Sequence, residues 1–232
     1  MAIMLKSSAP HVRGVARVDQ ELLEVDSTLK VAPIPVGPND WPQMGIIRSE
    51  PSRWPMTLES CDQLCHFMEG RATCTREGET IEVEPGTVVH FKTGWKGEIQ
   101  VHETVHFVYV CFPGAPAEKT PVLRDVATVP AEKDWGIIPT MLEGESRTSG
   151  ILLSRDADGG AESGIWICTP GKWHCHVTRD EFCHFLSGRC TYTHDRSGEV
   201  IEIEPDTAAF FPKDWKGTCV VHETVRKVYF IA

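Results

Sequence analysis

Short runs in which apolar and polar residues alternate with period two dominate the hydrophobic pattern of the chain. Thr80 to Glu84 and Val200 to Glu204 alternate β-branched and acidic residues, whereas Thr104 to Phe112 and Thr224 to Ala232 are rich in Val, Tyr and Phe. Both patterns are typical of β-strands. Gly, Pro and Asp separate the runs at short intervals, which favours a β-sandwich or a β-barrel.

Helical periodicity is almost absent. Only Gln20 to Val25 and Pro139 to Gly144 have patterns compatible with short helices or turns. The sequence therefore predicts an all-β fold.

The second half of the chain repeats the first in the same order. The matched segments are Cys65 to Arg71 with Cys183 to Arg189, Ile81 to Thr87 with Ile201 to Thr207, and Trp95 to Val105 with Trp215 to Val225. The copies differ in length by two residues at one place, where the first has Glu77-Gly78 and the second has Asp195 to Gly198. Both segments are typical of a hairpin turn. A repeat of this length is a small complete domain and not a solenoid unit.

The duplication also fixes the domain organisation. A chain of 232 residues is long enough for one large β-domain or two small ones, and the repeat selects two tandem barrels. We place the N-terminal domain at residues 1–112 and the C-terminal domain at 122–232. Residues 113–121, rich in Pro and Ala, form the expected linker.

Composition narrows the class of partner. The 33 acidic and 23 basic residues give a net charge of −10, so we expect neither a nucleic-acid partner nor a membrane surface. The N-terminus lacks the apolar run of a signal peptide, and nine cysteines are spread without a CxxC pair. These features predict a reduced, cytoplasmic protein.

The second copy contains a spacing typical of metal ligands. His174 and His176 stand two residues apart, so on a strand both imidazoles point to one side. After a predicted turn, Glu181 opens what we expect to be the neighbouring antiparallel strand, on the same face. Two imidazoles and one carboxylate suit Mn, Fe, Ni or Zn and leave positions open for water or substrate. We therefore predict a divalent metal at these three residues.

His174, His176, Glu181 and Gly188 match the first metal-binding motif of cupins, HxH-x4-E-x6-G. The Glu-Pro-Asp-Thr segment and the segment that begins Trp-Lys-Gly more narrowly resemble the cupin domains of (S)-ureidoglycine aminohydrolases. The resemblance implies two tandem double-stranded β-helix (jelly-roll) barrels, a bicupin, which agrees with the all-β pattern. It also implies a metal in the second barrel that activates a water or polarises a small substrate.

The chain departs from the cupin pattern in both copies. The second motif places a histidine five residues after its proline; that position holds His90 in the first copy and Phe210 in the second. The first-motif positions of the first copy hold Met56, Leu58 and Gln63. Only the second barrel is therefore expected to hold a metal, and Trp166, Trp173 and Phe210 are expected to line its pocket.

Other chemistry-bearing residues have simpler interpretations. Cys183 should lie on the same inward face as Glu181, as a pocket residue and a possible ligand or nucleophile. The first copy has Cys65 at the same position without the other ligands. This repetition favours a packing role for the cysteine. His90 and Gln63 mark the pocket of the first barrel, where a hydrogen-bonded histidine is favoured over a metal ligand.

Two functions of different classes remain open. One is a metal-dependent enzyme, similar to the aminohydrolases, that acts on a small polar nitrogenous or carboxylate compound; the other is a non-catalytic binding or accessory protein with a vestigial metal or none. No catalytic residue is assigned, because no general acid or base is left once the ligands are chosen. We expect a small-molecule ligand and, because barrels expose strand edges, a homodimer.

Overall fold

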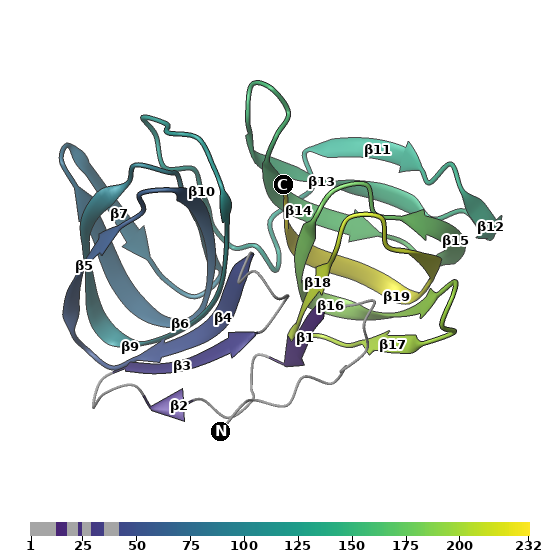
Figure 1. Cartoon of the computed structure of the whole chain (residues 1–232), viewed down its shortest axis with the longest axis horizontal. Helices are drawn as coiled ribbons and strands as arrows, with labels where there is room; N and C mark the ends of the chain where they lie inside the picture. The colour runs from purple at the N-terminus through teal and green to yellow at the C-terminus, as the bar shows by residue number, and fades with distance from the viewer. Residues whose placement is uncertain (1–12, 18–22, 25–28, 35–41) are drawn as a thin grey trace. The chain divides into compact units, whose positions relative to one another are not determined.

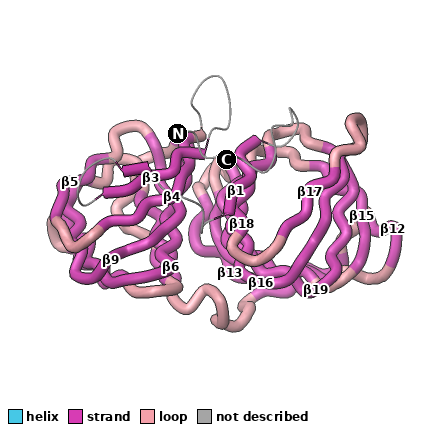
Figure 2. Tube along the Cα trace, turned by 90° about the horizontal axis from the view of Figure 1, so that it is seen from below, coloured by secondary structure: helices cyan, strands magenta, loops and turns pink. Residues whose placement is uncertain are grey.

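β-strands form all the regular structure of the part of the chain that the computed structural model describes, residues 13–17, 23–24, 29–34 and 42–232. Figure 1 shows the strands in two barrels, and Figure 2 shows strands joined by loops without a helix. No helix within these residues is long and apolar enough to cross a membrane. The prediction of an all-β fold with two jelly-roll barrels is confirmed.

The first unit is one antiparallel sheet that closes on itself. Its order is β10-β8-β6-β9-β4-β3-β2, with β5 paired to β9 and β7 paired to β6. The strands are β2 (Leu23–Glu24), β3 (Leu29–Ile34), β4 (Gln43–Ser49), β5 (Arg53–Thr57), β6 (Cys61–Arg76), β7 (Glu79–Val83), β8 (Thr87–Phe91), β9 (Lys96–Pro113) and β10 (Val122–Leu123).

The second unit repeats this topology. Its order is β1-β18-β16-β19-β14-β13-β11, with β17 paired to β16 and β15 paired to β19 and β12. The strands are β1 (Arg13–Arg17), β11 (Lys133–Ile137), β12 (Met141–Glu143), β13 (Arg147–Arg155), β14 (Glu162–Cys168), β15 (Gly171–His176), β16 (Glu181–His194), β17 (Val200–Ile203), β18 (Thr207–Phe211) and β19 (Lys216–Ile231).

The unit boundaries differ from the domains drawn on the sequence. β10 pairs with β8 of the first unit, so this unit extends to Val126 and includes the expected linker. β1 pairs with β18, and therefore belongs to the second unit although it precedes the first repeat. β10 and β1 each hydrogen-bond to the edge of an equivalent strand, β8 or β18, whose backbone groups would otherwise be unpaired on that side.

The structure describes one of the two segments with weak helical patterns and little of the other. Pro139 and Thr140 form a turn and Met141 to Glu143 form β12, so no helix exists there. Gln20 to Val25 lies largely outside the described residues, apart from β2. The two-residue turn Glu77-Gly78 and the longer loop between β16 and β17 confirm that the length difference between the copies falls in a hairpin.

Strand alternation decides which side chains enter each barrel. Val89 and Phe91 of β8 belong to the first core, and Ala209 and Phe211 of β18 belong to the second. Because side chains alternate between the faces of a sheet, the residue between each of these pairs points away from the barrel interior.

A glycine allows each long central strand to bend. Gly188 in β16 has φ of +79°, and the register with β19 shifts on both sides of it. A Cβ at this position would lie 2.2 Å from the carbonyl oxygen of Thr224. Gly70 repeats both features in β6, with a Cβ position 2.1 Å from the carbonyl oxygen of Thr104. The motif glycine is therefore required by the backbone of the barrel.

Gly188→Ala should destabilise the second unit by about 2–4 kcal/mol, because the new Cβ combines a left-handed backbone with a clash against another strand. Urea unfolding followed by tryptophan fluorescence measures the change. Gly198→Ala is the matched control: its φ is +67°, but nothing lies within 4 Å of the added Cβ. It should cost only about 1 kcal/mol. Equal losses for the two variants would contradict the steric explanation.

Candidate functional site

A lysine interrupts the apolar inward face of β19. Val225 belongs to the core of the second barrel, whereas Lys227, Tyr229 and Ile231 line a cavity of about 400 Å³. In the ladder, Lys227 stands opposite Phe185 of β16 and opposite Trp166 of β14. The barrel interior therefore contains an ammonium group surrounded by aromatic side chains.

The ammonium of Lys227 is held by two residues of β16. Its Nζ donates to Glu181 Oε1 at 2.8 Å and to Cys183 Sγ at 3.1 Å, and the Cys183 thiol donates to the same carboxylate oxygen at 3.4 Å. The Nζ also lies 4.7 Å from the ring centroid of Trp166, within cation–π range. The Lys227 side chain is only 7% exposed and that of Glu181 19% exposed, so the ion pair is buried.

The protonation states follow from these contacts. Burial disfavours the ammonium, but Cys183 and Glu181 outweigh that effect and hold the pKa of Lys227 above its ordinary value. Burial raises the pKa of the Cys183 thiol well above its usual range. At neutral pH the lysine is a cation and the cysteine a neutral thiol, so neither is a ready nucleophile.

A second carboxylate at the cavity wall is already neutralised. The phenol of Tyr229 donates to Glu162 Oε1 at 2.7 Å, and the Arg155 guanidinium donates to Glu162 Oε2 at 2.6 Å. Burial and this carboxylate raise the pKa of Tyr229. Each carboxylate of the cavity thus has a cationic partner: Lys227 for Glu181, and Arg155 for Glu162.

Aromatic rings form most of the remaining wall. The Trp166 and Trp173 ring centroids lie 6.5 Å apart, and those of Tyr192 and Phe211 lie 4.8 Å apart. Trp135 on β11 also lines the cavity but is 40% exposed, which places it at the rim. The cavity combines a charged pair with flat apolar surfaces, as small-molecule sites do.

The two histidines of the sequence motif lie on the other face of β15. His174 and His176 are exposed, and His176 Nε2 lies 3.5 Å from Asp214 Oδ1, whereas Trp173 and Cys175 line the cavity. The expectation that the imidazoles share a face with Glu181 is wrong. β15 pairs with β19 and β12 and not with β16, so Glu181 does not stand on a neighbouring strand.

The arrangement does not fit the divalent metal that the motif predicts. An ion at the Glu181 carboxylate would lie beside the Lys227 ammonium, whose charge repels it, and neither imidazole of the motif faces that position. In the part of the chain that the structure describes, no group of three or more His, Cys, Asp or Glu residues is placed to hold a metal ion.

The predicted pocket residues divide into two groups. Trp166 and Trp173 line the cavity, and Cys183 is buried directly behind it, bonded to Lys227. Phe210 is buried but points away from the interior, because it pairs with Phe182 while Phe211 pairs with Glu181. The inward position is thus one residue later than the motif suggests.

The first barrel has uncharged residues at the positions that match Glu181 and Lys227. Gln63 pairs with the inward-facing Phe91 and occupies the place of Glu181. Phe107 occupies the place of Lys227 and packs on Phe67, with ring centroids 4.7 Å apart. An aromatic ring therefore fills the space that the ion pair takes in the second barrel.

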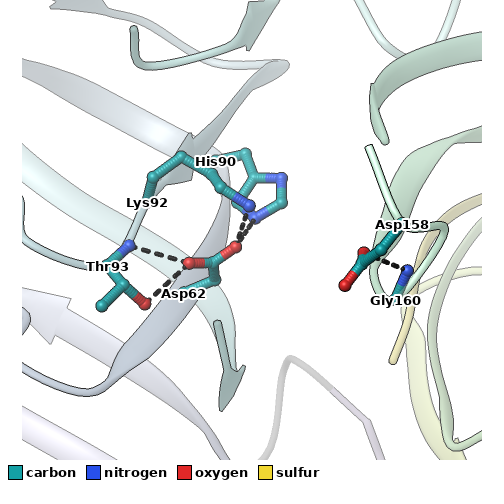
Figure 3. Close-up of polar contacts among 6 residues, drawn as sticks. All are labelled: Asp62, His90, Lys92, Thr93, Asp158 and Gly160. Atoms are coloured by element: carbon teal, nitrogen blue, oxygen red, sulfur yellow. Dashed lines mark hydrogen bonds and ion pairs between the residues drawn. The ribbon is translucent and has the colours of Figure 1, made fainter. Parts of the chain in front are cut away.

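His90 and Gln63 do not share a pocket. His90 lies on the opposite face of the sheet and is 1% exposed, with its Nε2 3.1 Å from Asp62 Oδ2. Asp62 also contacts the Lys92 ammonium and accepts from the backbone N–H of Thr93 at 2.7 Å, as Figure 3 shows. Burial would raise the pKa of Asp62, but these hydrogen bonds lower it to about 2.

This cluster is partly a repeated structural feature. In the second copy, Asp180 Oδ1 accepts from the backbone N–H of Lys213 at 2.6 Å, at the same turn. His90 and Lys92 are replaced there by Phe210 and Pro212. The aspartate fixes the turn after β8 or β18, and in the first copy it also contacts the Lys92 ammonium and the His90 imidazole.

The sequence did not reveal three polar residues of the cavity, Lys227, Glu162 and Tyr229. Comparison of the repeats contained the signal for the first: Lys227 stands where the other copy has Phe107, within a series otherwise apolar in both. Trp135 has no such signal, because it lies before the clearly repeated segments.

Comparison with known proteins supports the architecture. Residues 36–109 and 155–229 each match the family model described as EutQ-like cupin domain. No curated protein matches the sequence.

Solved structures similar to this chain have low sequence identity. A protein of unknown function from Pseudomonas syringae pv. tomato is 14% identical with a TM-score of 0.74, covering 97% of this chain and 100% of that one. A cupin 2 conserved barrel domain protein from Leptotrichia buccalis is 10% identical with a TM-score of 0.67, covering 99% of each chain. Oxalate decarboxylase from Bacillus subtilis is 12% identical with a TM-score of 0.56, covering 96% of this chain and 77% of that one. These similarities show the fold alone.

Lys227→Met should lower the free energy of unfolding of the second unit by about 3–5 kcal/mol, since it leaves the Glu181 carboxylate buried without its cation. Lys227→Met combined with Glu181→Gln should recover most of that loss. Denaturant unfolding measures both variants. Arg189→Met, which breaks an exposed ion pair with Glu223, should change stability little. A double variant no more stable than Lys227→Met would contradict the uncompensated-charge explanation.

The first unit should lose about 2 kcal/mol of stability as the pH falls from about 4 to 2. The folded pKa of Asp62 is depressed, so its contribution is complete above the unfolded value and disappears as the folded carboxylate is protonated. Asp62→Asn should remove this acid-dependent loss, while Asp180→Asn should retain it. Unfolding midpoints measured across this pH range test the assignment, and an unchanged acid profile for Asp62→Asn would refute it.

Proposed function

This chain belongs to the EutQ-like cupin domain family and contains that domain twice, and we propose that its second barrel binds a small organic molecule without a metal ion. The ligand occupies the cavity beside Lys227 and Glu181. The function is recognition of a small polar nitrogenous compound, and the first barrel serves as scaffold.

The buried ion pair is the observation that carries this proposal. Placing two charges inside a barrel costs desolvation free energy that their attraction does not reliably repay. The first barrel adopts the same fold with Gln63 and Phe107 at the equivalent positions, so folding does not require the pair. A costly feature that the fold does not need, at the wall of a cavity, points to ligand recognition.

The metal-dependent alternative has less support from the geometry. An aminohydrolase-like reaction, as the sequence resemblance suggests, would need His174, His176 and Glu181 on one ion. The histidines are exposed on one face of β15, while Glu181 is bonded to Lys227 on the interior side.

The protein purified without added metal should contain less than about one tenth of an ion per chain, and added Mn, Fe, Ni or Zn should not raise its melting temperature. Elemental analysis and thermal-shift assays make these measurements. One ion per chain that is lost in His174→Ala and kept in His90→Ala would establish the metal-dependent alternative instead.

A thermal-shift panel of neutral amides, carboxylates and amines should contain a compound that stabilises the wild-type chain. At about 100 times its Kd, such a compound contributes about 2.7 kcal/mol. The Lys227→Met and Glu181→Met double variant should lose this response, since it keeps the fold but has neither the donor nor the acceptor of the pair. A compound that stabilises both proteins equally binds elsewhere, and a panel with no response would count against the binding function.

A further inference from the structure

The Lys227–Glu181 pair retains hydrogen-bonding capacity that constrains the ligand, if the cavity binds one as proposed above. An ammonium has three N–H donors, and both oxygens of a carboxylate accept. Within the described residues, Lys227 donates to Glu181 Oε1 and to Cys183 Sγ, and Glu181 accepts at Oε1 alone. One N–H donor of Lys227 and the oxygen Oε2 of Glu181 therefore have no hydrogen-bond partner among the described residues, and both residues line the cavity.

The charges around the cavity favour a neutral ligand. Glu181 is paired with Lys227, and Glu162 is paired with Arg155. A carboxylate ligand would gain Lys227 but bring a third negative charge beside Glu181, and an amine ligand would add an unmatched cation. Either charge would lose its hydration in a cavity whose own charges are already balanced, which is costly.

The aromatic wall favours a planar ring. Trp166 and Trp173 face the cavity with their planes at 60°, and Trp135 lies at its rim. Flat indole surfaces gain most from flat ligands, through offset or edge-on ring contacts. A linear amide would satisfy the ion pair and leave these surfaces without contact.

We propose that the cavity binds a neutral planar heterocycle with a lactam edge, whose carbonyl oxygen accepts from Lys227 and whose ring N–H donates to Glu181 Oε2. A lactam places one acceptor and one donor on adjacent atoms of a flat ring. It thereby matches the spare donor, the spare oxygen and the aromatic wall at once. Carboxylates lack the donor and amines lack the acceptor.

Calorimetric titration of the full chain with matched probes tests the ligand class. Uracil and hypoxanthine carry lactam edges on planar rings, whereas 1,3-dimethyluracil keeps the uracil ring without an N–H. We expect the lactams to bind, and 1,3-dimethyluracil to bind about ten- to a hundred-fold more weakly, since it leaves a charged acceptor unpaired. Benzoate, benzylamine and acetamide represent the anionic, cationic and linear-amide classes and should bind more weakly than the lactams.

Two variants separate recognition from general damage to the barrel. The Lys227→Met and Glu181→Met double variant removes both the donor and the acceptor, and should bring the ratio of uracil to 1,3-dimethyluracil affinity close to one, a readout that structural disturbance alone does not produce. Trp135→Ala changes a partly exposed residue outside the ion pair. It should weaken both ring compounds and leave that ratio intact.

The possible failures are distinguishable. Tighter binding of benzoate, benzylamine or acetamide in a manner abolished by the double variant would overturn the lactam class and leave the binding function standing. Equal affinity for uracil and 1,3-dimethyluracil would do the same. If no lactam binds, the class is overturned as well, and the thermal-shift panel then decides the binding function separately.

Discussion

The interior of the second barrel depends on one constraint, that a buried ammonium must have a partner for its charge. Lys227 reaches into the barrel from β19, and Glu181 and Cys183 of β16 are its hydrogen-bond acceptors. The Lys227 ammonium beside Glu181 opposes a metal cation at this carboxylate by charge repulsion. The aromatic rings of Trp166 and Phe185 complete the surroundings of the cation. The cavity therefore combines one charged pair with flat apolar walls, the arrangement on which the proposed binding of an organic ligand rests.

The two halves show that fold and chemistry are separable in this chain. Strand order, the central glycines and the aspartate that fixes the turn before β9 or β19 recur in both units. Two matched positions that face the interior differ in charge: they hold Gln63 and Phe107 in the first unit and Glu181 and Lys227 in the second. The first barrel also has a buried charged cluster, at Asp62, but on the outer face of its sheet, where it supports a turn. At these matched interior positions, only the second copy carries charge.

Much of the fold follows from the sequence, because period-two alternation and an internal repeat are strong signals of physical origin. It was harder to predict which face of an individual strand points into the barrel. At β15 the motif favoured His174 and His176 as inward residues, whereas the apolar series Trp173, Cys175 and Val177 pointed to the opposite face, and burial of that series decided the outcome. The unit boundaries could not be found in this way, since the pairing of β1 with β18 joins residues from opposite ends of the chain.

A crystal structure grown with Mn²⁺, with anomalous scattering recorded from the metal, tests the central claim most directly. We expect Lys227 Nζ to donate to Glu181 inside the second barrel, no anomalous peak beside this carboxylate, and His174 and His176 to face outward. An anomalous peak about 2 Å from the Glu181 carboxylate, with both imidazoles turned inward onto it, would contradict the account.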